Sequence, residues 1–565
     1  MRFILPFLLL LLVGCAHQIP SHKAAVASAH PLATQAGIDV LNQGGNAFDA
    51  AVAVSAVLAV VEPAGSGLGG GGFWLLHRAS DQRQIMIDGR EMAPGKAHRD
   101  MYLGADGQHD KAASLNGPLS SGIPGLPAAL DHLSQQYGRL PLQKTLAPAI
   151  HHARSGFAIS DHYRTLARFR LPTLQASPAA AAIFLVNNAL PETNHILIQS
   201  DLANTLEQLA THGRKGFYQG DVAQRLLAGV SQAGGIWVQD DLDRYQVIER
   251  DVVKIRYQDY DISTATLPSS GGIVLSQILN QLSYLPMADC NTTQRQHIVV
   301  EAMRRAYYDR SRYLGDSDFV TIPDHLTEQP YAKMLAANID LIRATNNDDL
   351  TEPDSKGEDT THFSIIDHDG NRVSATLSIN YPFGSGFVAE GTGVLLNDEM
   401  DDFSSQIGAA NGYGLVGTEA NAIAPFKRPL SSMTPTFIEN QDRLMIIGTP
   451  GGSRIITMVL LGLLDFIDGY DARTIVAAPR YHHQYLPNEI QIESIGFSVT
   501  SQQALANYGH EINLLSRQYG NMQVISSDSN MQVIIVDKTT GQLDAASDPR
   551  GEGKAIIADT PNLAY

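Results

Sequence analysis

Residues 359–379 read DTTHFSIIDHDGNRVSATLSI, and this stretch decides the fold. Polar and apolar residues alternate over 361–367, the turn-forming triplet DGN occupies 369–371, and the alternation resumes over 373–379. A period of two places alternate side chains on opposite faces of a strand, and such runs joined by a short Asp/Gly/Asn turn are typical of a hairpin. The sequence therefore predicts two antiparallel strands, with two threonines at the head of the first.

The segment before this hairpin has a different character. Residues 345–359, TNNDDLTEPDSKGED, contain six acidic side chains, one lysine and a single large apolar side chain. Such a segment buries too little apolar surface to pack into a core. We therefore expect an exposed acidic loop that leads directly to Thr360 and Thr361.

A threonine at the start of a strand is usually only a β-branched residue in a favourable position. A catalytic interpretation requires a base, because a free hydroxyl is a weak nucleophile. If the chain is cut just before the threonine, its own α-amino group, with a reference pKa of about 7.7–8.0, becomes that base. Spacing alone leaves Thr360 and Thr361 as rival candidates.

The rest of the chain shows helical and strand patterns. Gly44 and Gly45 divide a helical stretch at 33–62, and Asn46 is a favourable N-cap for its second half. Residues 47–60 are nearly all alanine and valine, which indicates a helix buried on most sides. Further predicted elements are short strands at 73–77 and 84–88, helices within 124–172 and 199–229, an amphipathic helix at 299–314 and a buried helix around 458–464.

Composition excludes several classes of protein. The 565 residues include 58 acidic and 40 basic side chains, a net charge of −18, with 44% hydrophobic and 17% charged residues. That hydrophobic content excludes intrinsic disorder, and the acidic balance argues against a nucleic-acid partner. Two cysteines cannot build a disulfide framework or a cysteine-rich metal site.

The first 14 residues, MRFILPFLLLLLVG, place one arginine before about twelve apolar residues, too few for a stable membrane-spanning helix. Cys15 follows directly, and the junction resembles a bacterial lipobox, in which the cysteine is lipidated and becomes the new N-terminus. We therefore predict a lipoprotein signal peptide at 1–14 and an exported protein that Cys15 anchors to a bacterial membrane, facing the periplasm or the exterior. An ordinary secretion signal with an incidental cysteine is the alternative.

Several motifs, in one order, carry a resemblance to a known family. DTTHFS at 359–364 resembles the processing site of the gamma-glutamyltransferases, also called gamma-glutamyl transpeptidases. Four further motifs follow in family order: IDGREMAP at 87–94, LNDEMDDF at 396–403, KRPLSSM at 427–433 and GTPGGSR at 448–454. The resemblance runs from about residue 24 to the C-terminus, and long motifs in the correct order make it specific.

The resemblance implies an α+β fold of the N-terminal-nucleophile hydrolase type, an αββα sandwich of two stacked sheets flanked by helices. It implies cleavage between Asp359 and Thr360, with Thr360 as the nucleophile of both cleavage and catalysis. The products would be a large subunit, residues 15–359, and a small catalytic subunit, residues 360–565, held as a heterodimer in one intertwined domain.

The implied reaction transfers a gamma-glutamyl group, with glutathione as the expected donor, to water, amino acids or peptides. No cofactor and no metal are implied. The donor is a zwitterion at its α-carbon, so both charges need partners. The resemblance assigns its α-carboxylate to Arg90, Ser431 and Ser432, and its ammonium to Asn380, Glu399 and Asp402.

Three further assignments rest on the same resemblance. The backbone N–H groups of Gly451 and Gly452 would stabilise the oxyanion, and Tyr413 would gate the pocket as part of a lid over 404–418. Ser378 departs from the family pattern, where threonine is common at a position implicated in orienting the nucleophile. Serine keeps the hydroxyl, so we expect function to survive with an altered speed of processing.

Two other functions stay open at the level of sequence. One is a cephalosporin-type acylase on the same scaffold, which would take glutaryl groups that lack the ammonium and so would not need Asp402. The other is an uncleaved, inactive lipoprotein that serves as a binding module. Thr360, Arg90 and the Gly451-Gly452 pair argue against the second.

Overall fold

The structure is a computed structural model that describes residues 23–345, 360–404, 415, 417–515, 517–519, 522–524 and 529–559. The predictions made for Cys15, Asp359 and Tyr413, and for all of the acidic loop except Thr345, lie outside the described residues. None of the helices in the described ranges combines the length and the apolar character needed to cross a bilayer.

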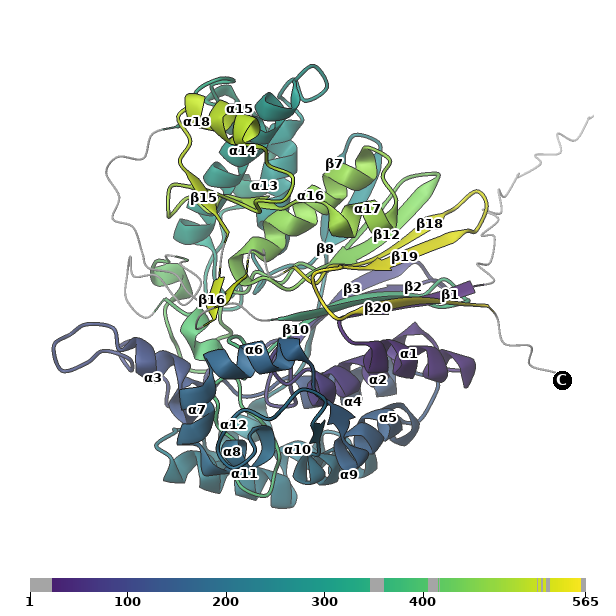
Figure 1. The fold of residues 1–565 in the computed structure, drawn as a ribbon, viewed down its shortest axis with the longest axis vertical. Helices are drawn as coiled ribbons and strands as arrows, with labels where there is room; N and C mark the ends of the chain where they lie inside the picture. The colour runs from purple at the N-terminus through teal and green to yellow at the C-terminus, as the bar shows by residue number, and fades with distance from the viewer. Residues whose placement is uncertain are drawn as a thin grey trace, which may run out of the picture.

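Two antiparallel sheets lie one above the other at the centre of the molecule (Figure 1). The first has the order β20-β1-β9-β10-β2-β3-β6, with bounds Lys554–Asp559, Lys23–Ser28, Thr361–Ile366, Arg372–Ser378, Gly71–Arg78, Arg83–Gly89 and Ile248–Arg250. The second has the order β19-β18-β12-β11-β8-β7, with bounds Leu543–Ser547, Gln532–Asp537, Arg443–Gly448, Thr436–Glu439, Tyr260–Thr264 and Val253–Tyr257. Both sheets mix strands from before residue 346 with strands from after residue 359.

Helices cover the outer face of each sheet, as Figure 1 shows with α1 and α2 below the sheets and α16 and α17 above them. The lower layer includes α1 (Pro31–Asn42), α2 (Ala47–Val61), α4 (Leu126–Gln136), α5 (Leu142–Ser155) and α9 (Ser200–His212). The upper layer includes α13 (Gly271–Leu282), α14 (Thr292–Tyr313), α16 (Ile455–Ile467) and α17 (Ala472–Ala477). This arrangement confirms the predicted αββα sandwich.

The remaining helices and strands lie around these layers. The helices are α3 (Lys111–Leu115), α6 (Asp161–Phe169), α7 (Leu171–Ala176), α8 (Pro178–Phe184), α10 (Lys215–Tyr218), α11 (Gly220–Gln232), α12 (Gln239–Arg244), α15 (Gln329–Ala337) and α18 (Val499–Asn507). The strands are β4 (Phe157–Ala158), β5 (Ile196–Leu197), β13 (Tyr481–His482), β14 (Ile490–Ile492), β15 (Ile512–Leu514), β16 (Arg517–Tyr519) and β17 (Met522–Val524).

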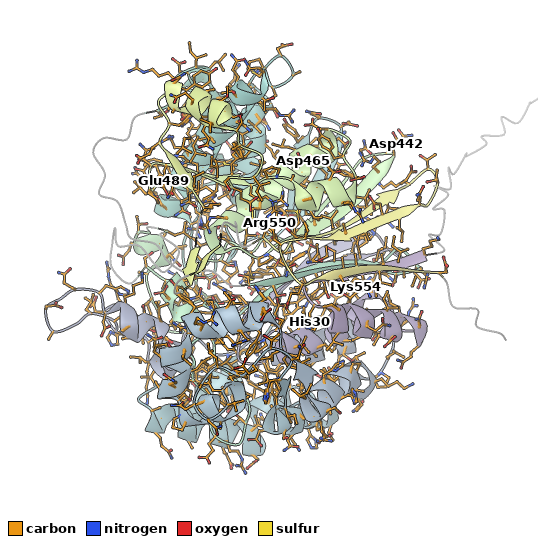
Figure 2. All side chains as sticks on the ribbon, viewed as in Figure 1. His30, Asp442, Asp465, Glu489, Arg550 and Lys554 are labelled. Atoms are coloured by element: carbon orange, nitrogen blue, oxygen red, sulfur yellow. The ribbon has the colours of Figure 1, made fainter. Side chains whose placement is uncertain are left out.

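Side chains alternate between the two faces of each strand, so the two sheets contribute to three apolar cores. On β1, Val26 packs into the core beneath the first sheet, whereas Ala25 and Ala27 face the second sheet. Phe437 and Ile446 meet them from the second sheet, whose other face packs against the upper helices. Side chains fill the space between all these layers (Figure 2). The central strands, such as β9, β10 and β12, bury both faces, which explains the high apolar content of a sandwich this size.

Local signals fix the elements that matter for the site. The Asn46 side chain accepts hydrogen bonds from the N–H groups of Phe48 and Asp49, and the Asp49 carboxylate accepts from the N–H of Asn46 at 2.9 Å. This capping box starts α2 where the sequence predicts it. Helix α14 begins at Thr292, seven residues before the predicted start, because Asn291 caps a polar first turn that apolar periodicity does not reveal.

The predicted hairpin is confirmed as β9 and β10. Asp367 closes its turn by accepting hydrogen bonds from the backbone N–H of Asn371 at 2.9 Å and from the Asn371 amide at 2.8 Å. The same carboxylate accepts from the N–H of Ala47 at 2.8 Å, which joins the turn to the start of α2. The opposite end of the hairpin, where β9 begins and β10 ends, is thereby set deep in the first sheet.

Candidate active site

A pocket at the start of β9, hereafter the Thr360 pocket, gathers residues from distant parts of the chain. Its lining consists of Arg90, Arg310, Thr360, Ser378, Asp402, Leu415, Leu430, Ser431, Ser432, Met433, Gly452, Ser453 and Ile455. Seven of the ten catalytic and substrate-binding residues predicted from the sequence are among them. These residues are far apart in the sequence, so their common position in one cavity indicates a functional site.

Strand register places Thr360 opposite Ser378. Leu377 pairs with Thr361 across the β9–β10 ladder, so one further antiparallel step brings Thr360 across from Ser378. The Thr360 side chain is buried, with 4% of the residue exposed, but it contributes to the pocket lining. Thr361 points elsewhere and donates its hydroxyl proton to Glu62 at 2.5 Å. Of the two rival threonines, Thr360 is the one that lines the pocket.

Arg90 follows the last residue of β3 and is almost completely buried, with 1% exposed. Its guanidinium lies 2.5 Å from the Glu399 carboxylate, 2.5 Å from that of Asp402 and 3.5 Å from that of Glu91. Burial opposes the charge on Arg90, but the carboxylates of Glu399 and Asp402 more than offset it, so its pKa is raised. The residues predicted to hold opposite ends of one zwitterion therefore form a single ion-pair cluster.

Burial also shapes the acids of this cluster. It raises the pKa of Glu399 to about 7, even though Arg90 favours the charged form. It raises the pKa of Glu91 well above its ordinary value, and the neighbouring Glu399 adds to that effect. The side chain of Asp402, by contrast, is 12% exposed and lies at the pocket wall. Asp402 is thus the acid of the cluster that faces the cavity.

Ser431 and Ser432 are held by the upper helices. The N–H of Ser431 donates to the Pro268 carbonyl at 2.8 Å, and its own carbonyl accepts from the N–H of Ser270 at 2.8 Å. Arg310 of α14 donates to the Ser432 hydroxyl at 3.1 Å. These contacts fix both serines in the lining of the pocket.

Three predicted residues lie next to the pocket rather than in its lining. Asn380 has a positive φ of 72°, donates its N–H to the Ser378 hydroxyl at 2.8 Å and donates its side-chain amide to the Asp398 carbonyl at 2.9 Å. Glu399 reaches the site through Arg90. Gly451 precedes Gly452 in the loop between β12 and α16, and their φ angles of 133° and 52° suit glycine. This loop brings backbone N–H groups to the beginning of a helix, a place that favours negative charge.

Arg310 lines the pocket but was not predicted from the sequence as a site residue. It lies on the apolar face of α14, at helical spacing from Met303, Ala306 and Tyr307, all of which are buried. A charged residue on the buried face of an amphipathic helix needs a polar partner, and this mismatch is the signal that could have revealed it.

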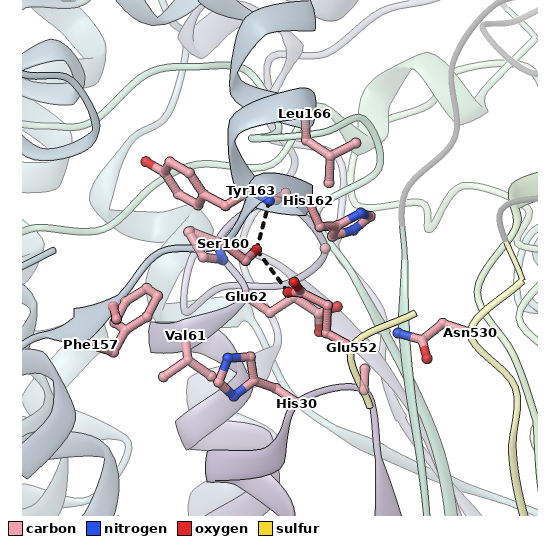
Figure 3. Close-up of a pocket in the computed structure, with 15 residues that line it drawn as sticks. His30, Val61, Glu62, Phe157, Ser160, His162, Tyr163, Leu166, Asn530 and Glu552 are labelled. Carbon is pink, nitrogen blue, oxygen red and sulfur yellow. Dashed lines mark hydrogen bonds between the residues drawn. The ribbon is translucent and has the colours of Figure 1, made fainter. Parts of the chain in front are cut away.

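A second cavity, hereafter the Glu62 pocket, borders the same strand start (Figure 3). It is lined by Ala29, His30, Val61, Glu62, Pro63, Ala64, Gly65, Phe157, Ala158, Ser160, His162, Tyr163, Leu166, Asn530 and Glu552. Gly65 packs so closely that an added Cβ would lie 3.3 Å from the Thr360 carbonyl oxygen. Burial raises the pKa of Glu62 to about 8, opposed by its hydrogen bond to Thr361 and reinforced by Glu552. Glu62 therefore binds Thr361 as a largely neutral carboxyl group at pH 7.

Potential metal ligands gather away from both pockets. In the described ranges, one group of His, Cys, Asp or Glu side chains has suitable spacing: His297, Glu301 and His510. The two histidine rings are hydrogen-bonded to each other at 2.7 Å, and His297 also bonds to the Asp340 carbonyl at 2.7 Å. Glu301 forms ion pairs with Arg304 and Arg305. These existing bonds and the two arginines disfavour a cation there.

Comparison with protein families and characterised sequences gives a consistent result. The family model described as Gamma-glutamyltranspeptidase matches residues 33–558. The chain is 42% identical to the glutathione hydrolase proenzyme of Pseudomonas sp. strain A14 over 509 residues, which is 88% of each chain. It is 40% identical to the glutathione hydrolase proenzyme of Escherichia coli K12 over 94% of this chain and 91% of that one.

Solved structures agree with this result. The cephalosporin acylase of Bacillus halodurans superposes with a TM-score of 0.81 at 26% identity, over 94% of this chain and 95% of that one. The gamma-glutamyltranspeptidase of Helicobacter pylori superposes with a TM-score of 0.55 at 37% identity, over 57% of this chain and 94% of that chain. The first likeness extends over nearly the whole chain and therefore includes both sheets.

Proposed function

The chain belongs to the gamma-glutamyltranspeptidase family, and from this premise we propose that Thr360 is the nucleophile with which it cuts itself and then transfers gamma-glutamyl groups. The protein is an autoprocessing gamma-glutamyltransferase and glutathione hydrolase. The observation that carries the assignment to particular residues is the Thr360 pocket, in which a hydroxyl nucleophile, Arg90, Asp402 and two serines share one lining.

Self-cleavage begins with attack of the Thr360 hydroxyl on the Asp359 carbonyl carbon. The C–N bond of that peptide breaks, the nitrogen takes up a proton, and an ester joins Asp359 to the Thr360 oxygen. Water then hydrolyses the ester, which frees the Asp359 carboxylate and leaves Thr360 with a free α-amino group. The products are the large subunit, 15–359, and the small subunit, 360–565. They stay together as a heterodimer because both sheets contain strands of both.

The new α-amino group provides the base that the hydroxyl lacks. It accepts the Thr360 hydroxyl proton as the oxygen attacks the donor's gamma-carbonyl, and the N–H groups of Gly451 and Gly452 stabilise the oxyanion. The amide bond breaks, and the leaving amine receives the proton. Water or the amine of an amino acid or peptide then attacks the gamma-glutamyl ester and restores the Thr360 hydroxyl.

Charge recognition explains the choice of a glutamyl group. The donor's α-carboxylate interacts with Arg90, Ser431 and Ser432, and its ammonium interacts with Asp402, supported by Glu399 and Asn380. In the structure Arg90 and Asp402 are 2.5 Å apart, so a zwitterion can enter between them without leaving either charge unpaired. A charge-assisted hydrogen bond of this type contributes about 1.5–3 kcal/mol.

The proposed location of the protein in the cell is inferred from its N-terminal residues. We propose export by the signal peptide at 1–14 and lipid attachment at Cys15, which anchors the soluble body to a bacterial membrane on its periplasmic or outer side. Mass spectrometry of the N-terminal peptide is the direct measurement, and an unmodified N-terminus would reject lipid attachment while leaving the enzymatic assignment intact.

Replacement of Thr360 is the first test and has the largest expected effect. Thr360→Ala removes the hydroxyl that starts cleavage, so denaturing electrophoresis should show one uncut chain, and a gamma-glutamyl anilide should not be hydrolysed. Wild type should give two bands, with the shorter fragment beginning at Thr360 by N-terminal sequencing.

Thr361→Ala is the matched control, because it removes the neighbouring hydroxyl, which contacts Glu62 instead of the Thr360 pocket. This variant should still be cut before residue 360. Cleavage of Thr360→Ala, or a short fragment that begins elsewhere, would overturn the assignment.

The acylase alternative has one specific observation in its favour, the likeness to the cephalosporin acylase structure. Asp402 at the pocket wall opposes it, because a glutaryl group carries no ammonium for this acid to bind. Turnover of gamma-glutamyl and glutaryl anilides by the same preparation distinguishes the two, and preference for the glutaryl compound would favour the acylase.

A further inference from the structure

Arg310 is a second buried arginine in the Thr360 pocket, and its surroundings differ from those of Arg90. It is 5% exposed, and in the described part of the chain it forms no ion pair. Its Nε donates to the Ser270 hydroxyl at 2.9 Å and its Nη2 donates to the Ser432 hydroxyl at 3.1 Å. Burial of a guanidinium among neutral hydroxyls costs free energy unless a negatively charged group nearby compensates its charge.

Hydrogen-bond direction shows what Arg310 does to the serines. A hydroxyl has one proton to donate and two lone pairs, whereas a guanidinium can only donate. The Ser432 oxygen therefore accepts from Arg310, and its proton is available to another acceptor. The Ser431 oxygen likewise accepts from the N–H of Met433 at 3.1 Å. Both hydroxyl protons can then be directed to one anion in the pocket.

Ser270 connects Arg310 to the other end of the serine pair. Its hydroxyl accepts from Arg310 and donates to the Ser431 carbonyl at 2.7 Å, while its N–H donates to the same carbonyl at 2.8 Å. Arg310 thus contacts the Ser431-Ser432 segment directly at Ser432 and indirectly through Ser270. Loss of Arg310 would remove the bond to Ser432 and the bond that fixes the Ser270 hydroxyl, while the bonds from Ser270 to the Ser431 carbonyl would remain.

We propose that Arg310 is a positioning residue for the donor's α-carboxylate, which orients the hydroxyls of Ser431 and Ser432 toward it and adds positive charge to that end of the pocket. This inference rests on the proposed function. Arg90 faces the carboxylates of Glu91, Glu399 and Asp402, so much of its charge is already compensated. Arg310 has none of these close carboxylate contacts, and Asp402 acts on its charge only from beyond ion-pair distance.

The test compares donors with and without the α-carboxylate. Arg310→Gln keeps a donor group but removes the charge, and Arg310→Lys keeps the charge but cannot reach both serines in the same way. For a gamma-glutamyl anilide, we expect Arg310→Gln to raise KM about tenfold or more with a smaller change in kcat, and Arg310→Lys to fall between it and wild type. For the α-carboxamide analogue of that anilide, KM should change less than threefold. Arg312→Gln, an exposed arginine on the same helix, is the matched control and should behave as wild type.

A double-mutant cycle with Ser432→Ala tests whether Arg310 acts through that serine. The effects of Arg310→Gln and Ser432→Ala on KM should then be far from additive. Equal KM increases for the two donors, or additive effects, would overturn the proposal. Each variant is first checked for two bands on a denaturing gel. If wild type gives a short chain beginning at 360 and turns over gamma-glutamyl anilide, the proposed function stands even where the role of Arg310 fails.

A variant that does not process would prevent this kinetic measurement. In that case Arg310→Lys and Ser270→Ala replace Arg310→Gln. Ser270→Ala removes the hydroxyl that accepts from Arg310 and donates to the Ser431 carbonyl, but it keeps the backbone N–H bond to that carbonyl. It should therefore raise KM for the gamma-glutamyl anilide more than for the carboxamide. No difference between the two donors in either variant would again overturn the proposal.

Discussion

The Thr360 pocket and the Glu62 pocket border neighbouring residues at the start of one strand, yet the acids Asp402 and Glu62 in their linings differ in their charge partners. In the Thr360 pocket, Arg90 and Asp402 are charged partners 2.5 Å apart, and a second arginine lies close by. In the Glu62 pocket, Glu62 bonds to the Thr361 hydroxyl, and no basic side chain in the described ranges forms an ion pair with Glu62. His30 in the same lining has its pKa lowered by burial to about 4, so it is neutral as well.

This difference suits the Thr360 pocket to binding a ligand and the Glu62 pocket to fixing the start of β9. A pocket that keeps charged groups at its wall is suited to a zwitterionic substrate, because the substrate replaces one set of charge partners with another. A buried carboxyl that stays neutral, as Glu62 does, is suited to a fixed hydrogen bond, here one that positions the residue after Thr360. Substitutions in the two pockets should therefore respond to different variables, substrate charge in the first and pH in the second.

Asp402→Asn should give the larger effect. It removes the negative charge that faces the cavity, so kcat/KM for a gamma-glutamyl anilide should fall about 10- to 100-fold, since charge-assisted hydrogen bonds are worth roughly 1.5–3 kcal/mol. A glutaryl anilide has no ammonium and should lose less than threefold. Steady-state kinetics with both anilides measures the change in their ratio.

Glu419→Gln is a suitable control for Asp402→Asn. Glu419 is an exposed acid that pairs with Arg99 outside the pocket, and its neutralisation should leave both rates unchanged. If Asp402→Asn lowers kcat/KM equally for the two anilides, the acid supports the structure of the pocket but does not bind the donor's ammonium group.

Glu62→Gln should give a smaller effect that depends on pH. The pKa of Glu62 rises from its ordinary value of 4.5 to about 8 in the folded protein, chiefly through burial. Between these values the folded chain keeps a proton that the unfolded chain has lost, so the contribution of Glu62 to stability falls as pH rises from about 4.5 to 8 and is constant above that. Glutamine is neutral throughout and removes this dependence. In the uncut Thr360→Ala background, Glu62→Gln should lose less Tm than its parent between pH 5 and pH 8.

Glu207→Gln provides the comparison for that measurement. Glu207 lies on the lower helix α9 and pairs with Arg154 at the surface, so its neutralisation should not alter the pH dependence of Tm. If Glu62→Gln and its parent lose the same Tm over this pH range, Glu62 is not a neutral carboxyl in the folded chain.

Sequence patterns predict those parts of the site that are local. Alternation and a DGN turn predict the hairpin of β9 and β10, Asn46 predicts the start of α2, and the αββα class follows from the resemblance. Each of these depends on residues close together in the chain or on a motif whose order is preserved. They place Thr360 at the head of a strand, which is where the structure has it.

Contacts between distant segments were beyond the reach of those patterns. Periodicity indicates that Arg310 lies on a buried helix face, but it cannot show that Ser270 and Ser432 meet it there. The motifs name Arg90, Glu399 and Asp402 separately, whereas the structure joins them in one ion-pair cluster. The bond of Glu62 to Thr361 connects residues 299 positions apart, and no local signal specifies such a partner.

Ser378→Thr is expected to have the smallest effect and tests how precisely the hairpin positions Thr360. Ser378 lies across from Thr360, is 5% exposed, and accepts the N–H of Asn380 at 2.8 Å. Threonine retains this hydroxyl and suits a strand, but its extra methyl group must fit a packed wall, where overpacking typically costs about 1–3 kcal/mol. We expect the rate of self-cleavage to change by up to about fivefold, with less change in the turnover of the mature enzyme. Time courses of precursor loss on denaturing gels measure the first, and anilide hydrolysis after complete processing measures the second. Identical time courses for Ser378→Thr and wild type would show that the wall accommodates the methyl group and that this position does not control the geometry of cleavage.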